Sequence, residues 1–158
     1  MIVEGEHTFA GAREAVWSLL LDPEVIAKTM PGTQAMVLVA PGRYEGKMRV
    51  GVGDLLAADF DLAVTLADVV APERYTMLIG GRGRLGVMRG QARISLEENG
   101  AATVMRFKTE VEVGGKIAAL GQHLLDSVSR LLAKQGLEAL AREVVKRLRG
   151  QGPGSFHP

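Results

Sequence analysis

The sequence predicts an α+β fold in which a curved antiparallel sheet of about seven strands wraps around one long C-terminal helix. Two short helices are expected after the first strand. Between residues 43 and 113, apolar and polar side chains alternate with a period of two, which is typical of strands covered on one side. Residues 117–144 carry a wide apolar stripe with helical spacing. A sheet that is apolar on one face needs a cover, and the long helix can supply it.

The N-terminal segment predicts one strand and two helices. Ile2–Phe9 alternates loosely, and Ala12–Leu21 has apolar residues three and four positions apart. Asp22-Pro23-Glu24 is a helix-start signal, because Asp can cap free N–H groups, Pro suits the first helical position and Glu opposes the helix dipole. We therefore expect a second helix over about residues 23–28, ended by Met30-Pro31-Gly32.

The central segment predicts a meander of about six hairpin-linked strands. Its turns are marked by Pro41-Gly42, Pro72-Glu73 and Asn99-Gly100, of which Asn-Gly is the strongest short hairpin signal. Glycines at 51, 53, 80, 81, 83, 86 and 90 are expected to provide bend positions in a curved sheet. Such a sheet often leaves a gap against its helix, and that gap is the candidate site.

The last helix is expected to start after Gly114-Gly115 and to exceed thirty residues, a length of roughly 50 Å. Gly136 is expected to bend or weaken it. Residues 1–149 then form one domain that includes this candidate site, and residues 150–158 have the composition of a disordered tail.

Composition narrows the function classes. A net charge of +1 gives no global electrostatic case for nucleic acid, and zero cysteines exclude disulfides and thiolate metal sites. No apolar run reaches eighteen residues, and the N-terminus lacks a signal-peptide pattern, so a cytoplasmic location is expected.

Charge is distributed unevenly along the chain. Residues 74–93 hold five arginines and no acid, and the last helix ends in basic residues. Four aspartates cluster before the first of these regions: Asp54, Asp59, Asp61 and Asp68. One interpretation is that strands of opposite sign lie side by side and keep the surface soluble. The other is a basic face that meets anionic lipid or an acidic partner.

The candidate ligand-binding residues lie on the apolar face of the strands and on the facing side of the helix. They are Tyr44, Met48, Phe60, Tyr75, Met77, Met88, Met105, Phe107, Leu124 and Val128. For each one the alternative is ordinary core packing. Methionine favours a binding cavity because it adapts to irregular apolar shapes.

Catalytic and metal sites are not expected. His7, His123 and His157 lack metal-ligand spacing, and Asp59 and Asp61 fall on the polar face of their strand. Gly81-x-Gly83-x-x-Gly86 has dinucleotide-site spacing, but no helix pattern follows it, as that fingerprint requires.

Four segments also carry a family resemblance: Val16-Trp17, Leu20-Leu21-Asp22-Pro23-Glu24, Met30-Pro31-Gly32 and Gly114-Gly115-Lys116-Ile117-Ala118-Ala119-Leu120-Gly121. They resemble the carbon monoxide dehydrogenase G-subunit (CoxG) family, part of the START and birch-pollen-allergen-like helix-grip (SRPBCC) superfamily, over residues 1–149. The resemblance implies a hydrophobic cavity, a quinone-like or other lipid ligand, no intrinsic cofactor, and an accessory role for a molybdenum-containing carbon monoxide dehydrogenase-type enzyme at the membrane. Because some relatives carry a C-terminal extension and this chain ends soon after Arg149, peripheral membrane contact is expected through the basic helix end, a loop or the bound lipid.

Two other functions stay open from the residues alone. A small cyclase- or hydrolase-like enzyme could use the same cavity, but it would need converging polar groups, and Tyr44, Tyr75 and Thr109 are the only candidates on the apolar face. A protein-interaction module would instead have a filled core.

Overall fold

The computed structural model describes residues 1–51 and 57–150, and it contains one seven-stranded antiparallel sheet of order β1-β7-β6-β5-β4-β3-β2. Its elements are β1 Ile2–Phe9, α1 Arg13–Leu20, α2 Pro23–Thr29, β2 Thr33–Ala40, β3 Arg43–Gly51, β4 Ala57–Val70, β5 Arg74–Gly83, β6 Gly86–Asn99, β7 Ala102–Gly114, the 3₁₀ helix η1 Gly115–Leu120 and α3 Gln122–Gly150. The predicted fold class is confirmed. Asp54, Gly53 and residues 151–158 lie outside the described residues.

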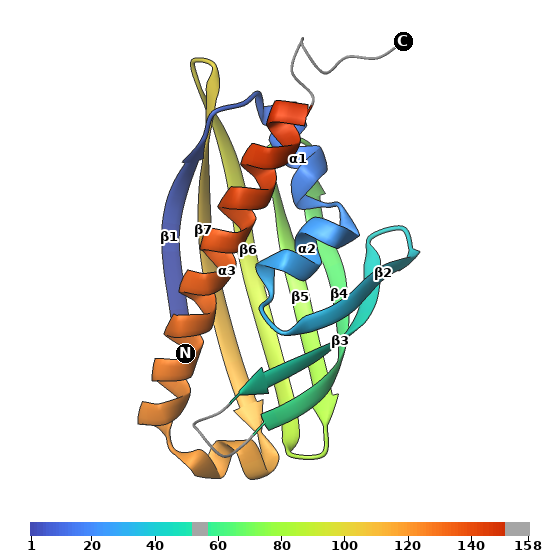
Figure 1. The fold of residues 1–158 in the computed structure, drawn as a ribbon, viewed down its shortest axis with the longest axis vertical. Helices are drawn as coiled ribbons and strands as arrows, with labels where there is room; N and C mark the ends of the chain where they lie inside the picture. The colour runs from blue at the N-terminus through green and yellow to red at the C-terminus, as the bar shows by residue number, and fades with distance from the viewer. Residues whose placement is uncertain (52–56, 151–158) are drawn as a thin grey trace.

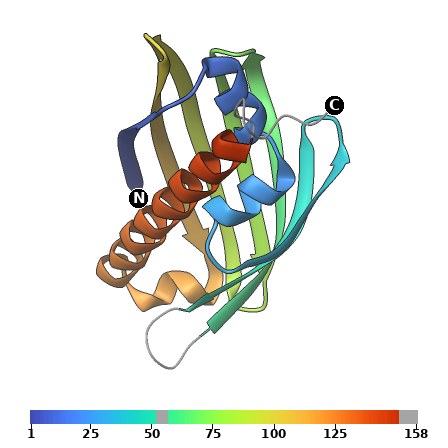
Figure 2. The ribbon, with the colours of Figure 1, turned by 45° about the horizontal axis from the view of Figure 1, so that its top comes forward.

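The packing of the helices on one face of the sheet follows from the alternation of apolar and polar residues along the strands. Figures 1 and 2 show α3 crossing the concave face of the sheet, with α1 and α2 beside it and β2–β3 curling forward past α2. The predicted apolar face points inward: Tyr44, Phe60 and Val64 are 3%, 5% and 1% exposed. The helix-start signal also acts as expected, since the Asp22 side chain accepts a hydrogen bond from the Glu24 amide at 2.8 Å.

The prediction of one continuous helix after Gly115 is wrong. Residues 115–120 form η1, and Gly121, with φ +94°, separates it from α3. A left-handed backbone ends a helix, and glycine adopts it without steric cost. The 29 residues of α3 span about 43 Å. Leu125 is 7% exposed and belongs to the core, whereas Leu131 is 54% exposed.

Gly136 serves close packing between helices. It is buried, and a Cβ atom built on it would lie 2.2 Å from the Thr29 carbonyl oxygen at the end of α2. The expectation that this glycine only weakens α3 misses its role, because any side chain there would push α2 away from α3.

The two ends of the molecule differ in packing. We call the end formed by α1, the β6–β7 turn and the C-terminal half of α3 the α1 end, and the end formed by η1, the β5–β6 turn and the first turn of α3 the η1 end (Figure 1). The α1 end is filled: Phe9, Val16 and Val144 are 1%, 0% and 0% exposed. Trp17 packs edge-on against Tyr75, with ring centroids 5.2 Å apart.

Candidate functional site

An apolar cavity lies between the concave face of the sheet and the helices α2 and α3, with a volume of about 300 Å³. This volume falls at the lower limit of the range for small-molecule sites, roughly 300–1,000 Å³. An apolar cavity of about half this size can stay dry and accept benzene. The core of this fold is therefore not completely filled, in contrast to what a pure interaction module would need.

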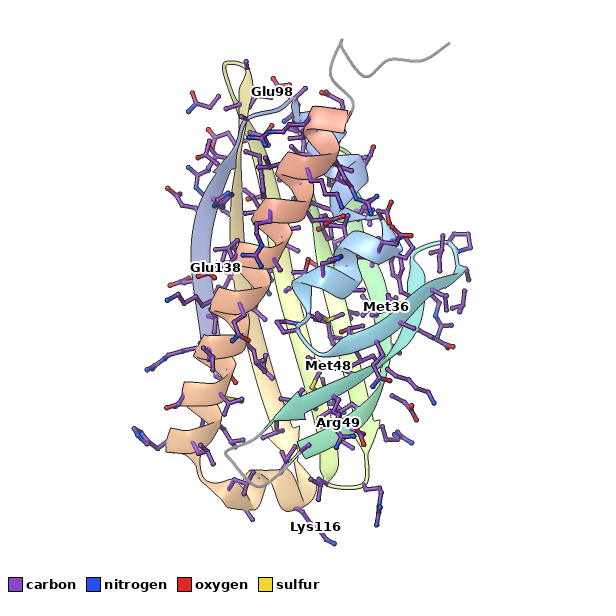
Figure 3. The ribbon with its side chains drawn as sticks, viewed as in Figure 1. Met36, Met48, Arg49, Glu98, Lys116 and Glu138 are labelled. Atoms are coloured by element: carbon purple, nitrogen blue, oxygen red, sulfur yellow. The ribbon has the colours of Figure 1, made fainter. Side chains whose placement is uncertain are left out.

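Most of the predicted site residues line this cavity. They are Met48, Phe60, Tyr75, Met77, Met88, Met105, Phe107 and Val128. Methionine is the most frequent residue type of the wall, to which six of the seven methionines in the chain contribute: Met1, Met30, Met48, Met77, Met88 and Met105. Flexible, polarizable side chains on several sides can adapt to ligands of irregular shape. In Figure 3 the Met48 side chain lies between β3 and the middle of the sheet.

Tyr44 and Leu124 are absent from the lining. The Tyr44 hydroxyl donates a hydrogen bond of 2.7 Å to the Leu21 carbonyl at the end of α1, which directs the ring away from the cavity. Leu124 is half-buried, and its neighbour Leu125 lines the cavity instead. Both leucines have helical spacing to Val128, so spacing alone does not distinguish them.

The sequence did not predict the part of the cavity wall that comes from α2 and the residues after it. Ile26, Thr29, Met30 and Pro31 line the cavity opposite the sheet. The close approach at Gly136 holds this segment against α3. The four-residue spacing of Ile26 and Met30 was the one sequence signal that pointed to this wall.

The polar groups of the wall are few, and none of its side chains is charged among the described residues. The Thr29 hydroxyl donates to the Val25 carbonyl at 2.9 Å, and the Ser129 hydroxyl contacts the Met1 sulfur at 3.0 Å. Tyr75 is only 3% exposed, and within the described part of the chain its hydroxyl has no hydrogen-bond partner. Burial, and to a smaller extent the nearby Tyr44, raises the pKa of the Tyr75 phenol, so this hydroxyl stays neutral and can donate a hydrogen bond.

The remaining candidate groups lie away from the cavity. His123 is exposed, and His7 packs edge-on against Phe9 at 4.7 Å between ring centroids. The Asp59 carboxylate lies 3.6 Å from the Arg49 guanidinium on the outer face, and Asp61 is opposite both Lys47 and Arg82 in the strand register. This pairing agrees with strands of opposite charge lying side by side. Among the described residues, three or more His, Cys, Asp or Glu side chains nowhere gather as a metal site would need.

The Gly81-x-Gly83-x-x-Gly86 spacing belongs to a hairpin. β5 ends at Gly83, β6 begins at Gly86, and Gly86 has φ +142°. The segment that follows is a strand, so the spacing is a turn feature and not a phosphate-binding loop. Across residues 1–51 and 57–150, no helix has the length and hydropathy needed to cross a membrane.

Solved structures share this fold. A conserved protein from Geobacillus kaustophilus is 28% identical over 92% of this chain and 96% of its own, with a TM-score of 0.81. The Zhui aromatase/cyclase from Streptomyces sp. R1128 is similar in fold, with a TM-score of 0.69 and 18% identity over 96% of this chain and 98% of its own. A START superfamily protein from Mycobacterium smegmatis is also similar in fold, with a TM-score of 0.68 and 14% identity over 92% of this chain and 97% of its own. No curated protein sequence matches this chain.

The family model of the carbon monoxide dehydrogenase G-subunit (CoxG) matches residues 5–145, which include all the cavity-lining residues except Met1 and Val3. The resemblance drawn from the short motifs is thereby confirmed over nearly the whole chain. The match covers most of the chain, and the chain therefore belongs to the carbon monoxide dehydrogenase G-subunit (CoxG) family.

Proposed function

We propose that this protein is a non-catalytic accessory protein that holds an apolar ligand of the quinone or lipid class in its cavity. It would assist or recruit a molybdenum-containing, carbon monoxide dehydrogenase-type enzyme at the membrane. The proposal that the protein binds an apolar ligand rests on the cavity of about 300 Å³. Its wall includes six methionines and no charged side chain among the described residues. The family membership supports the accessory role.

The wall favours a neutral ligand with a compact head. A charged group would lose its hydration there without gaining a partner, which is costly in an apolar interior. A carbonyl oxygen, by contrast, can accept a hydrogen bond from the Tyr75 hydroxyl while the rest of a ring packs against methionine and phenylalanine. A quinone head has this combination of an apolar ring and carbonyl oxygens.

The same wall supports binding rather than catalysis. General acid–base chemistry needs a titratable group near neutral pH within hydrogen-bond reach of the substrate. Tyr75 is the one titratable side chain among the described lining residues, and its pKa is raised away from neutrality. None of the described lining side chains can exchange a proton readily at pH 7.

Ligand binding can be tested by titrating the protein with a short-chain menaquinone analogue and following the fluorescence of Trp17. Trp17 is the single tryptophan and contacts Tyr75, which lines the cavity, so a bound quinone should quench it. We expect saturable quenching with one ligand per chain. Absence of saturable quenching would contradict the proposal.

A pair of variants on α3 makes this titration specific. Ala133→Leu adds three carbons to the cavity wall and should weaken binding at least tenfold, whereas Leu131→Met changes an exposed side chain of the same helix and should leave binding unchanged. Tyr75→Phe removes only the hydroxyl and should weaken binding about threefold to tenfold. Equal affinity for all four proteins would place the ligand elsewhere.

The accessory role needs a separate measurement. Purified molybdenum enzyme and this protein should form a complex in analytical ultracentrifugation, and the enzyme should reduce the quinone analogue faster when the protein is present. If quinone binds and neither effect occurs, the ligand part survives and the enzyme part is wrong.

A further inference from the structure

The η1 end brings together two segments that are distant in sequence. The turn between β5 and β6 contacts η1 directly, because the Ile117 amide donates a hydrogen bond of 2.8 Å to the Leu85 carbonyl. Val87 at the start of β6 lies opposite Gly114 at the end of β7. Figure 1 shows both segments at the same extremity, and Figure 3 shows the Lys116 side chain projecting outward from it.

The cations of this end lack ionic partners. Arg82, Arg84 and Lys116 are exposed, and none of the described carboxylates lies within 4.0 Å of their charged nitrogens. Asp61 lies opposite Arg82 on the adjacent strand β4, but the two side chains form no ion pair. Glu112 and Asp126 flank the segment 113–125, and Asp59 and Asp61 lie on the adjacent strand β4. None of these carboxylates forms an ion pair with Arg82, Arg84 or Lys116 within the described residues, so the three cations can meet an anionic surface.

Apolar side chains lie among these cations. Val87 is 47% exposed, Leu85 is half-buried, and Ala118 and Ala119 are exposed beside Lys116. An extremity with basic residues around exposed apolar ones suits the interface of an anionic bilayer, where the charges meet headgroups and the apolar groups enter the acyl boundary. An acidic protein surface would match the charges but would leave these apolar groups without a matching environment.

We propose that the η1 end docks on anionic lipid bilayers through Arg82, Arg84 and Lys116, with Val87 entering the interface. The cavity reaches this end, because Met88, Val113, Ile117 and Leu125 all line it. Docking would therefore place the cavity next to the membrane from which an apolar ligand comes. The proposal gives the proposed function a membrane-facing surface, but vesicle docking itself needs no ligand.

The test is co-sedimentation of the full chain with vesicles of phosphatidylcholine alone or with about one third phosphatidylglycerol, in the absence of quinone. We expect binding to the anionic vesicles only, and weaker binding as salt is raised. The triple change Arg82→Gln, Arg84→Gln and Lys116→Gln should lower the partition coefficient on the order of a hundredfold, since each basic residue near an anionic surface contributes about fivefold.

The matched control removes the same charge from the other end of α3. Arg142→Gln, Lys146→Gln and Arg149→Gln alter exposed residues at the α1 end and should leave most of the binding intact. Equal losses in both triple variants would overturn the proposal, because only net charge would then matter. Undiminished binding of the η1-end variant would also overturn the proposal, as would wild-type protein that does not bind anionic vesicles.

A neutral variant separates lipid from an acidic protein. Val87→Ser keeps the charge and should lower vesicle binding severalfold, whereas an unchanged partition coefficient would contradict insertion and favour a purely electrostatic partner. All changed residues are exposed, and circular dichroism verifies the fold of each variant. Quinone quenching in the η1-end variant should equal that of the wild type, so failure of docking and failure of ligand binding are distinguishable.

Discussion

The α1 end and the η1 end show how one sheet and one helix can be packed in two different ways. At the α1 end, Val16, Val144 and Phe9 fill the space between the layers. Arg147 lies 3.3, 2.7 and 3.0 Å from the carboxylates of Asp22, Glu24 and Glu143 there. Toward the η1 end the layers separate around a cavity, and Arg82, Arg84 and Lys116 at the surface have no ionic partners among the described carboxylates.

This difference teaches that stability and binding capacity are supplied by different parts of the fold. A filled and ion-paired end can hold the sheet on the helix, which permits the rest of the interior to remain hollow. If this division is correct, equivalent mutations at the two ends should have unequal effects.

The largest contrast is expected between two phenylalanines. Phe9→Ala removes a ring that is 1% exposed in the filled end and should lower the free energy of unfolding by about 3–5 kcal/mol. Phe107→Ala removes a half-buried ring at the cavity wall, which already lacks neighbours on one side, and should cost about 1–2 kcal/mol. Urea unfolding followed by circular dichroism measures both, and equal losses would argue against the division.

Gly136 tests the boundary between the two ends. On helix propensity alone Gly136→Ala would stabilise α3 by about 1 kcal/mol. Because the new Cβ would overlap the Thr29 carbonyl, we expect a net loss of about 1–3 kcal/mol instead. Gly80→Ala is the control, since a Cβ there meets nothing within 4 Å and should change stability by less than about 0.5 kcal/mol. A stabilised Gly136→Ala protein would mean that α2 can move away from α3 at little cost.

Arginine substitutions compare paired and unpaired charges. Arg147→Met should lower the free energy of unfolding by about 1–2 kcal/mol, because it leaves the partly buried Glu143 without its hydrogen-bond donor. Arg84→Met should have almost no effect on stability, since Arg84 is exposed and unpaired within the described residues. Thermal unfolding at low and high salt should show a salt-dependent difference between the two variants.

The smallest expected effect is a dependence on pH at the α1 end. The hydrogen bond from Arg147 is the main cause that lowers the pKa of Glu143 below its ordinary value of 4.5. A carboxylate whose pKa falls on folding stabilises the native state above its unfolded pKa, and this contribution is lost as the pH drops through the folded pKa.

The wild type should therefore be more stable than Glu143→Gln by about 1 kcal/mol or less at pH 7. This advantage should shrink steadily below pH 4.5. Unfolding curves of both proteins between pH 3 and pH 7 measure it. A difference that does not change with pH would show that the carboxylate contributes through packing and not through its charge.

Much of the fold could be predicted because it depends on local patterns. Strict alternation around Tyr44, Phe60 and Met105 identifies strands and their inner face, and Asp22-Pro23 marks a helix start without tertiary information. The cavity wall follows from the same inner face, which is why most of the predicted residues line it.

The rest depended on contacts between segments far apart in the chain. The left-handed backbone of Gly121 cannot be distinguished by sequence from a glycine inside a helix, so the sequence could not show that α3 begins only at Gln122. The direction of the Tyr44 hydroxyl depended on how the end of α1 packs, 23 residues earlier. Which cations are paired depended on strand register and on the docking of α3.

The methionine-rich wall also has a practical consequence for spectroscopy. Methionine methyl groups move freely at the end of a flexible side chain and report on the atoms that surround them. With ¹³C labelling of these methyl groups, most of the resonances in a single spectrum would come from the cavity wall, while Met36, which is buried but outside the lining, would serve as an internal reference. A ligand that enters the cavity should move the wall signals and leave Met36 in place, so occupancy could be mapped residue by residue without any change to the sequence.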